Sequence, residues 1–143
     1  MIKKLNRLCV IGLGLIGGSL AKAAKDRNLC KQVIGFSRSH ETMKAALKAS
    51  VVDKIVENIK SLPDDLGSED LVVIAVPTLA VSAIFLELRG LLSETVTITD
   101  VSSVKGSVVK SVFDIYGCNP SQFVPGHPIA GSERSGINAV NPL

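Results

Sequence analysis

Short apolar runs alternate with amphipathic stretches along most of this chain. The apolar runs, each of strand length, lie at 7–11, 32–36, 71–76 and 96–99. The stretches whose apolar residues recur at helical spacing lie at 16–26, 41–48, 81–92 and 105–116. Runs that are apolar almost throughout are typical of parallel strands covered by helices on both faces. The alternation predicts an α/β fold with a doubly wound, mainly parallel sheet and helices on both faces, and a weaker strand is expected within 51–59.

A glycine-rich turn joins the first predicted strand to the first predicted helix. Gly12 permits a tight bend, Gly14 lets backbone N–H groups approach a ligand without an intervening Cβ, and Gly17 lets the helix pack closely on its strand. The first amides of a helix lack intrahelical acceptors and carry partial positive charge, so they bind anions. The turn predicts a Rossmann-type dinucleotide site that holds a pyrophosphate at Gly12, Gly14, Leu15, Ile16 and Gly17.

The same segment also has features of a secretory leader. Lys3, Lys4 and Arg7 precede an apolar stretch at 8–20, and residues 21–23 resemble a cleavage site. The glycines within that stretch favour turns over a continuous apolar helix, and the elements that follow complete a nucleotide-binding fold. We therefore interpret the segment as part of the fold. No other segment approaches the 18 or more apolar residues of a membrane span.

The composition is typical of one globular domain that spans residues 1–143. The chain is 46% hydrophobic and 20% charged, and a domain of this length buries roughly 68% of its unfolded surface. The most polar connector, at 61–68, is expected to be a surface loop. The net charge of +3 comes from scattered basic residues, and there is no Trp for base stacking, so nucleic acid is not an expected partner.

The cysteines do not indicate a metal site. Cys9, Cys30 and Cys118 are odd in number and lack the spacing of metal ligands. We expect no bound metal and interpret the three as reduced, buried thiols of a cytoplasmic protein.

Polar and small residues follow each predicted strand, at the edge of the sheet where ligands of such folds bind. They are Ser37 and Arg38, Pro77 and Thr78, the segment 100–103, and the tail around His127. Among them, we expect Pro77, Thr78 and Ser102 to contact the cofactor.

The position that usually selects the dinucleotide is Ser37, twenty residues past Gly17, and Arg38 follows it. A carboxylate there accepts hydrogen bonds from the ribose of NAD. Ser37 and Arg38 instead donate hydrogen bonds, and a 2′-phosphate would accept them, which favours NADP over NAD. In the alternative interpretation Arg38 is a solvated loop residue and Ser37 caps the helix near Glu41, which leaves NAD tolerated.

The segment 123–133 is too rich in Gly and Pro for regular structure and predicts a rigid, shaped loop around His127. Pro125 and Pro128 restrict the backbone on either side of this histidine. An imidazole titrates near neutrality and is suited to accept the proton of a hydroxyl group whose carbon loses a hydride. The alternative is a structural histidine that bonds to loop backbone. His40 is expected at the surface.

Two serines, Ser102 and Ser103, follow the fourth predicted strand. They precede the helix at 105–116 and would cap it in the simplest interpretation, with Asp100 satisfying its first turn. They also lie on the ligand-binding side of the sheet. We favour a polar role for Ser103 beside the histidine and the nicotinamide.

Three motifs occur in order: the glycine turn at 12–19, Asp-Val-Ser-Ser-Val-Lys-Gly at 100–106, and Gly-His-Pro-Ile-Ala-Gly-Ser-Glu-Arg-Ser-Gly at 126–136. Together they resemble the prephenate/arogenate dehydrogenase family. The resemblance implies the N-terminal nucleotide-binding domain of a tyrosine-biosynthesis oxidoreductase. Such an enzyme oxidises prephenate or arogenate by hydride transfer to NAD(P)+ with loss of CO2. The resemblance also implies that His127 is the catalytic base, that Ser103 is its partner, and that Ser132 and Glu133 lie near the substrate.

Enzymes of this family continue into a helical domain that forms a homodimer and completes the substrate site. We expect that domain to be absent from this chain, which would bind NADP(H) but turn over substrate negligibly by itself. Two other interpretations stay open. One is a non-catalytic NAD(P)-binding regulatory domain, which has no need of His127 and Ser103 at strand ends. The other is a 3-hydroxyacid or imine reductase that shares the first domain, which the Gly-His-Pro stretch fits poorly.

Overall fold

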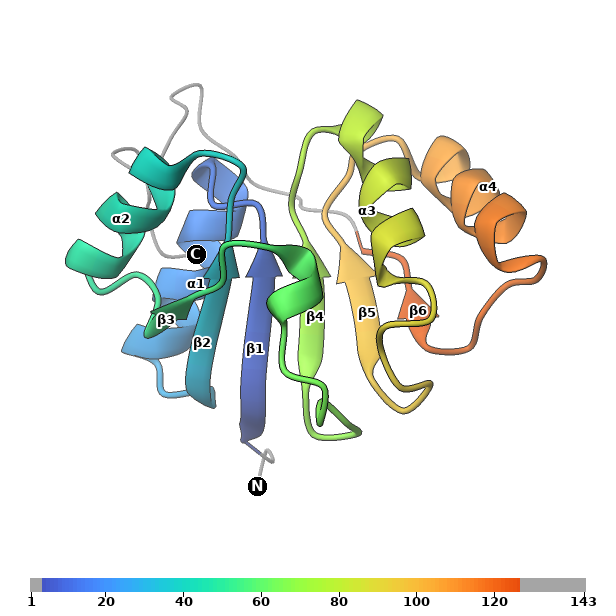
Figure 1. The fold of residues 1–143 in the computed structure, drawn as a ribbon. Helices are drawn as coiled ribbons and strands as arrows, with labels where there is room; N and C mark the ends of the chain where they lie inside the picture. Colours follow the sequence, from blue (N-terminus) through green and yellow to red (C-terminus); the bar gives the residue numbers. More distant parts are fainter. Residues whose placement is uncertain (1–3, 127–143) are drawn as a thin grey trace.

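A computed structural model describes residues 4–126 and shows a six-stranded sheet in which every pairing is parallel. The strands are β1 (Leu5–Ile11), β2 (Cys30–Phe36), β3 (Lys54–Ile55), β4 (Leu71–Ile74), β5 (Thr97–Asp100) and β6 (Phe123–Val124). Their order in the sheet is β3-β2-β1-β4-β5-β6 (Figure 1). The chain therefore builds outward from β1 in one direction and from β4 in the other. The predicted doubly wound α/β fold is confirmed.

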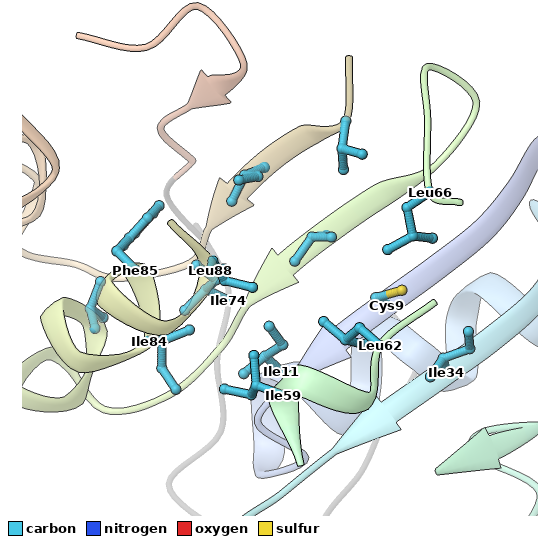
Figure 2. Close-up of a cluster of buried hydrophobic side chains, with 14 of the residues drawn as sticks. Cys9, Ile11, Ile34, Ile59, Leu62, Leu66, Ile74, Ile84, Phe85 and Leu88 are labelled. Atoms are coloured by element: carbon cyan, nitrogen blue, oxygen red, sulfur yellow. The ribbon is translucent and has the colours of Figure 1, made fainter. Parts of the chain in front are cut away.

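Helices cover both faces of this sheet. The α-helices of the described part are α1 (Leu15–Asp26), α2 (His40–Lys48), α3 (Val81–Leu88) and α4 (Lys105–Tyr116), and the 3₁₀ turns are η1 (Ile59–Ser61) and η2 (Thr78–Ala80). One buried cluster joins the sheet to α1 and α2, and a second joins its other face to η1, α3 and α4. Successive residues of β1 serve opposite faces, since Leu8 and Val10 belong to the first cluster and Cys9 and Ile11 to the second. Figure 2 shows the second cluster.

Two predicted elements end earlier than the sequence suggests. The predicted helix at 81–92 ends at Leu88, because Arg89 is extended and Gly90 has φ +76°. The predicted strand at 71–76 ends at Ile74. Each of these differences shortens an element whose apolar pattern continues beyond it.

The prediction that segment 123–133 has no regular structure is wrong at its first two residues, because Phe123 and Val124 form β6 alongside β5. The Phe123 ring packs edge-on against Phe85 of α3, with 5.1 Å between ring centroids. The prediction of a surface loop at 61–68 is also wrong in part. Leu62 and Leu66 are buried in the core beside η1 (Figure 2).

The cysteines differ in exposure. Cys9 and Cys30 are buried as predicted, whereas Cys118 is exposed, which corrects the expectation of three buried thiols. Burial raises the pKa of Cys9 to about 12, so this thiol stays protonated and unreactive. Across residues 4–126, no helix combines the length and the apolar character that crossing a membrane requires.

Candidate nucleotide-binding site

The glycine turn after β1 is fixed by contacts that leave no room for side chains. Gly12 has φ +103°, and a Cβ on it would lie 2.5 Å from the Ala75 carbonyl oxygen. Its amide donates a 2.8 Å hydrogen bond to the Phe36 carbonyl, which ties the turn to the end of β2. A Cβ on Gly17 would lie 1.9 Å from the Gly12 carbonyl oxygen and 3.0 Å from the Ala75 Cβ. The helix thus packs against the turn itself and against the residue that follows β4.

Gly14 differs because no atom of the described residues lies within 4 Å of the position its Cβ would occupy. It is the N-cap of α1, with φ −76° and ψ −156°, and no side chain caps this end of the helix. The first amides of α1 therefore have no side-chain acceptor, and the helix dipole favours negative charge in front of them. This arrangement fits a pyrophosphate group, as the glycine spacing predicts.

A cavity of about 300 Å³ opens in front of this turn. Its walls are the residues at the carboxyl ends of β1, β2 and β4, namely 12–14, 36–38 and 75–77, with Ala80 and Ile84. Of the predicted cofactor-binding residues, Gly12, Gly14, Ser37, Arg38 and Pro77 line the cavity, whereas Leu15, Ile16, Gly17, Thr78 and Ser102 do not.

Sequence reasoning missed six further wall residues: Leu13, Phe36, Ala75, Val76, Ala80 and Ile84. Three of them fall inside predicted strands, where apolar character indicates core. The signal that would have found Phe36, Ala75 and Val76 is their position at or just after the carboxyl end of a strand beside β1. Ligands of such sheets bind there, where the strand order switches from one side of β1 to the other.

Ser37 and Arg38 lie at the β2 side of the cavity. The Ser37 hydroxyl oxygen accepts a hydrogen bond from the Ser39 amide at 3.2 Å and keeps its own proton to donate. The residue that caps α2 is Ser39, whose oxygen accepts from the Thr42 amide at 3.2 Å, so Ser37 does not cap this helix. Arg38 is exposed, and no carboxylate in residues 4–126 pairs with it.

A polar cluster lies at the end of β5, beside this cavity. Asp100 is completely buried and accepts hydrogen bonds from the Ser102 amide at 3.0 Å and from the Lys105 ammonium. The Ser102 hydroxyl lies 3.0 Å from that of Thr78, which joins the β5–α4 turn to η2. Asp100 thus pairs with a lysine side chain.

Ser103, unlike Ser102, is exposed. The N-cap of α4 is Val104, without a side-chain cap, and the Val104 amide donates to the Ser102 oxygen at 3.2 Å. The capping interpretation therefore does not apply to Ser103. His127, Ser132 and Glu133 lie outside the described residues, but Gly126, which precedes His127 in sequence, is described. Its amide donates to Asp100 Oδ1 at 3.2 Å.

A second, larger cleft of about 600 Å³ lies between the last residues of α3 and α4, at the opposite edge of the sheet. None of the predicted site residues lines it. The smaller cavity is therefore the candidate site, since it combines the glycine turn with the carboxyl ends of three strands.

Comparison with known families agrees with this geometry. The family model described as "Prephenate dehydrogenase, nucleotide-binding domain" matches residues 20–142. The chain belongs to this family. The resemblance found in the sequence motifs is thereby confirmed, and the candidate site is that of a nucleotide-binding domain.

Relatives of this chain are found among bacterial enzymes. Prephenate dehydrogenase of Bacillus subtilis is 38% identical over 138 residues, which cover 94% of this chain and 36% of that protein. A prephenate dehydrogenase structure from Aquifex aeolicus, in complex with hydroxyphenyl propionate and NAD+, has a TM-score of 0.86 at 30% identity and covers 99% of this chain and 48% of that one. Synechocystis arogenate dehydrogenase has a TM-score of 0.82 at 29% identity, covering 95% and 45%. The chain thus spans less than half the length of each.

Proposed function

We propose that this chain binds NAD(P) and forms part of a dehydrogenase that oxidises prephenate or arogenate with loss of CO2, a step of tyrosine biosynthesis. The observation that carries the proposal is the open space at Gly14, in front of the uncapped N-terminus of α1. Family membership and the NAD+ bound in the Aquifex aeolicus relative support it.

The residues around the cavity fit a dinucleotide. The amides of Leu15, Ile16 and Gly17 at the start of α1 would hold the pyrophosphate, and the apolar wall at Ala75 and Val76 would exclude water from one side. When bound, the nicotinamide supplies the acceptor for a hydride. Thr78 and Ser102 do not line the cavity. We therefore propose that they contact the dinucleotide farther along its length, near the end of β5, where their hydroxyls meet.

We further propose that NADP is preferred over NAD. Ser37 and Arg38 line the cavity beside β2, where no described carboxylate competes for the guanidinium. A 2′-phosphate would accept hydrogen bonds from both side chains, and binding it would break no ion pair of Arg38 within residues 4–126.

Proton removal is assigned to His127, with Ser103 as its partner, and substrate contact to Ser132 and Glu133. Ser103 is exposed at the carboxyl end of β5, and its neighbour Ser102 carries the structural hydrogen bonds of the turn. Because Ser102 makes these hydrogen bonds, the Ser103 hydroxyl is left to interact with His127 and the substrate. Loss of the carboxylate is driven by aromatisation of the ring, so alignment and deprotonation are what the residues supply.

Because the chain spans less than half of its relatives, we propose that turnover needs more than residues 1–143. The complete protein would be a cytoplasmic homodimer whose additional helical domain completes the substrate site. It is not expected to bind nucleic acid, a membrane or a metal.

Calorimetric titration of the chain with NADP+ and NAD+ tests the binding half of this proposal. The wild-type chain should bind at least one of them, and Gly14→Ala should weaken binding at least about tenfold, because its Cβ occupies the pyrophosphate position. Gly67→Ala, at the other edge of the sheet, is the matched control with unchanged affinity. Absence of binding heat, or equal affinity of Gly14→Ala and wild type, contradicts the proposal.

The catalytic half is tested on the complete gene product. Prephenate and arogenate are assayed with each cofactor, and His127→Asn should lower kcat by roughly a hundredfold or more with dinucleotide affinity unchanged. A regulatory domain without chemistry would show binding and no oxidation of either substrate.

A further inference from the structure

We propose that Asp100 is a positioning residue for the reaction, which holds the turn that leads into His127 and the turn that carries Ser103 in one arrangement. This inference rests on the proposed function, because it assigns Asp100 to residues whose catalytic role is itself proposed. Asp100 ends β5 and has no exposed surface, so it acts on its neighbours and does not meet substrate.

The two carboxylate oxygens of Asp100 bind different segments of the chain. Oδ2 accepts from the Ser102 amide at 3.0 Å and from the Lys105 ammonium, both in the β5–α4 segment. Oδ1 accepts from the Gly126 amide at 3.2 Å, which lies 26 residues away in sequence. One buried side chain therefore fixes the spacing between the residues just before Ser103 and the residue just before His127.

The backbone of Gly126 also lies directly against the end of β5. A Cβ on this glycine would be 2.6 Å from the Asp100 carbonyl oxygen and 3.0 Å from Thr99 Oγ1. The preceding residues Phe123 and Val124 pair with Ile98 and Thr99, so β6 delivers the chain to this point in register. The close approach is specific to glycine and brings the amide within reach of Oδ1.

The cluster extends to the nucleotide side of the site through Ser102. Its hydroxyl lies 3.0 Å from Thr78 in η2, and η2 follows Pro77 in the cavity wall. A purely electrostatic role for Asp100 would need only Lys105. The additional bonds to two backbone amides from separate turns are what a positioning role requires.

The test uses Asp100→Asn in the complete gene product. Asparagine offers one carbonyl oxygen, so it cannot accept from both Gly126 and Ser102, and its NH2 group would face one of their amides. We expect kcat to fall about tenfold to a hundredfold, as a displacement near 1 Å would cause, and to fall by a clearly larger factor than the affinity for the dinucleotide, which changes only through Ser102. Assays are run at a temperature where circular dichroism shows the variant folded.

Asp53→Asn is the matched control. Asp53 also pairs with a lysine, Lys25 at 2.9 Å, and accepts from a backbone amide, Val33 at 2.8 Å, but it lies away from the site. It should leave kcat unchanged. Equal losses of kcat in both variants, or parallel losses of kcat and dinucleotide affinity in Asp100→Asn, would reduce Asp100 to a structural ion pair.

A second variant keeps the inference testable if Asp100→Asn does not fold. Gly126→Ala retains the carboxylate and its lysine but displaces the turn, because its Cβ meets the Asp100 carbonyl. It should lower kcat by a similar factor with dinucleotide affinity unchanged, and wild-type kcat in this variant overturns the inference. If the proposed function itself is wrong, the wild-type protein shows no oxidation of either substrate. If only the role of Asp100 is wrong, wild type is active and the variants keep its kcat.

Discussion

Each glycine of the turn after β1 meets a different steric limit. Gly12 is required by its positive φ and by the Ala75 carbonyl, whereas Gly17 is required chiefly by the Gly12 carbonyl, with the Ala75 Cβ also close. At Gly14, no atom of residues 4–126 lies within 4 Å of the position a Cβ would occupy. Gly12 and Gly17 are therefore required for the fold, whereas Gly14 leaves space for a ligand in front of α1.

This difference predicts opposite effects of two alanine substitutions. Gly17→Ala should lower the free energy of unfolding by about 1–3 kcal/mol, because a Cβ 1.9 Å from a backbone oxygen forces the turn to shift. Gly14→Ala should change it by less than about 0.5 kcal/mol. Urea unfolding of both variants measures the contrast, and equal stability of the two would contradict the steric argument.

The proposed preference for NADP can also be tested at a single residue, Arg38. Arg38→Ala should weaken NADP+ binding about tenfold to a hundredfold, the effect of one charge-assisted hydrogen bond, and change NAD+ binding less than about twofold. Arg27→Ala removes an exposed arginine at the end of α1 and serves as the control. Calorimetry of wild type and both variants with each dinucleotide gives the binding constants, and equal losses for the two cofactors in Arg38→Ala would refute the assignment.

At the scale of elements, β1 is anchored to the segment before β4 by Arg7. Asp70 accepts from the Arg7 amide at 2.9 Å and from its guanidinium at 3.2 Å, and Asp65 accepts from the same guanidinium at 2.8 Å. The hydrogen bonds to Asp70 and then to Asp65 raise the pKa of Arg7 above its ordinary value. A residue that a leader peptide would use as a positive charge is here part of the fold.

Loss of the buried partner should weaken this anchor strongly. Asp70→Asn should lower the free energy of unfolding by about 3 kcal/mol, because Asp70 is only 4% exposed and its removal leaves the Arg7 charge partly uncompensated. Asp65→Asn, at a side chain 75% exposed, should cost much less. Chemical denaturation compares the two variants. Similar losses of unfolding free energy would show that Asp70 contributes no more than Asp65 to holding β1.

Elements with strong local patterns were predictable from the sequence, and short ones were not. The helix α4 has the predicted bounds because Val108 and Val112 recur at helical spacing and Gly117, with φ +75°, ends it. By contrast, β6 has two residues, and its pairing with β5 and the contact of Phe123 with Phe85 create it. The end of α3 was missed because Leu91 and Leu92 continue the apolar pattern beyond Gly90.

Over the whole molecule, the site follows from the order of the strands. Strands are added on one side of β1 up to β3, and the chain then crosses to β4 on the other side of β1 (Figure 1). The carboxyl ends of β1, β2 and β4 therefore surround one cavity. Strand alternation and the glycine turn were enough to predict this edge. The polar cluster at Asp100 was not predictable, since its bonds to Lys105 and Gly126 depend on how β6 returns to β5.

The stability of the whole fold should fall with acidification through Asp53, which links α1, β2 and the start of β3. Burial opposes ionisation of this carboxyl, but the hydrogen bonds from Lys25 and the Val33 amide outweigh it and lower its pKa. A carboxyl with a lowered pKa in the folded state contributes stability that is complete above its unfolded pKa, near 3.8, and is lost as pH falls through the folded value.

The corresponding prediction is that Asp53→Asn is less stable than wild type by about 1 kcal/mol or less at pH 7, since the pair is partly exposed. The difference should persist down to about pH 5 and shrink below the ordinary pKa of an aspartate. Urea titrations of wild type, Asp53→Asn, Lys25→Met and the double variant between pH 3 and 7 give the coupling between the two side chains. A coupling that stays constant to pH 3 would exclude ionised Asp53 as its source, because only the carboxylate attracts the Lys25 ammonium.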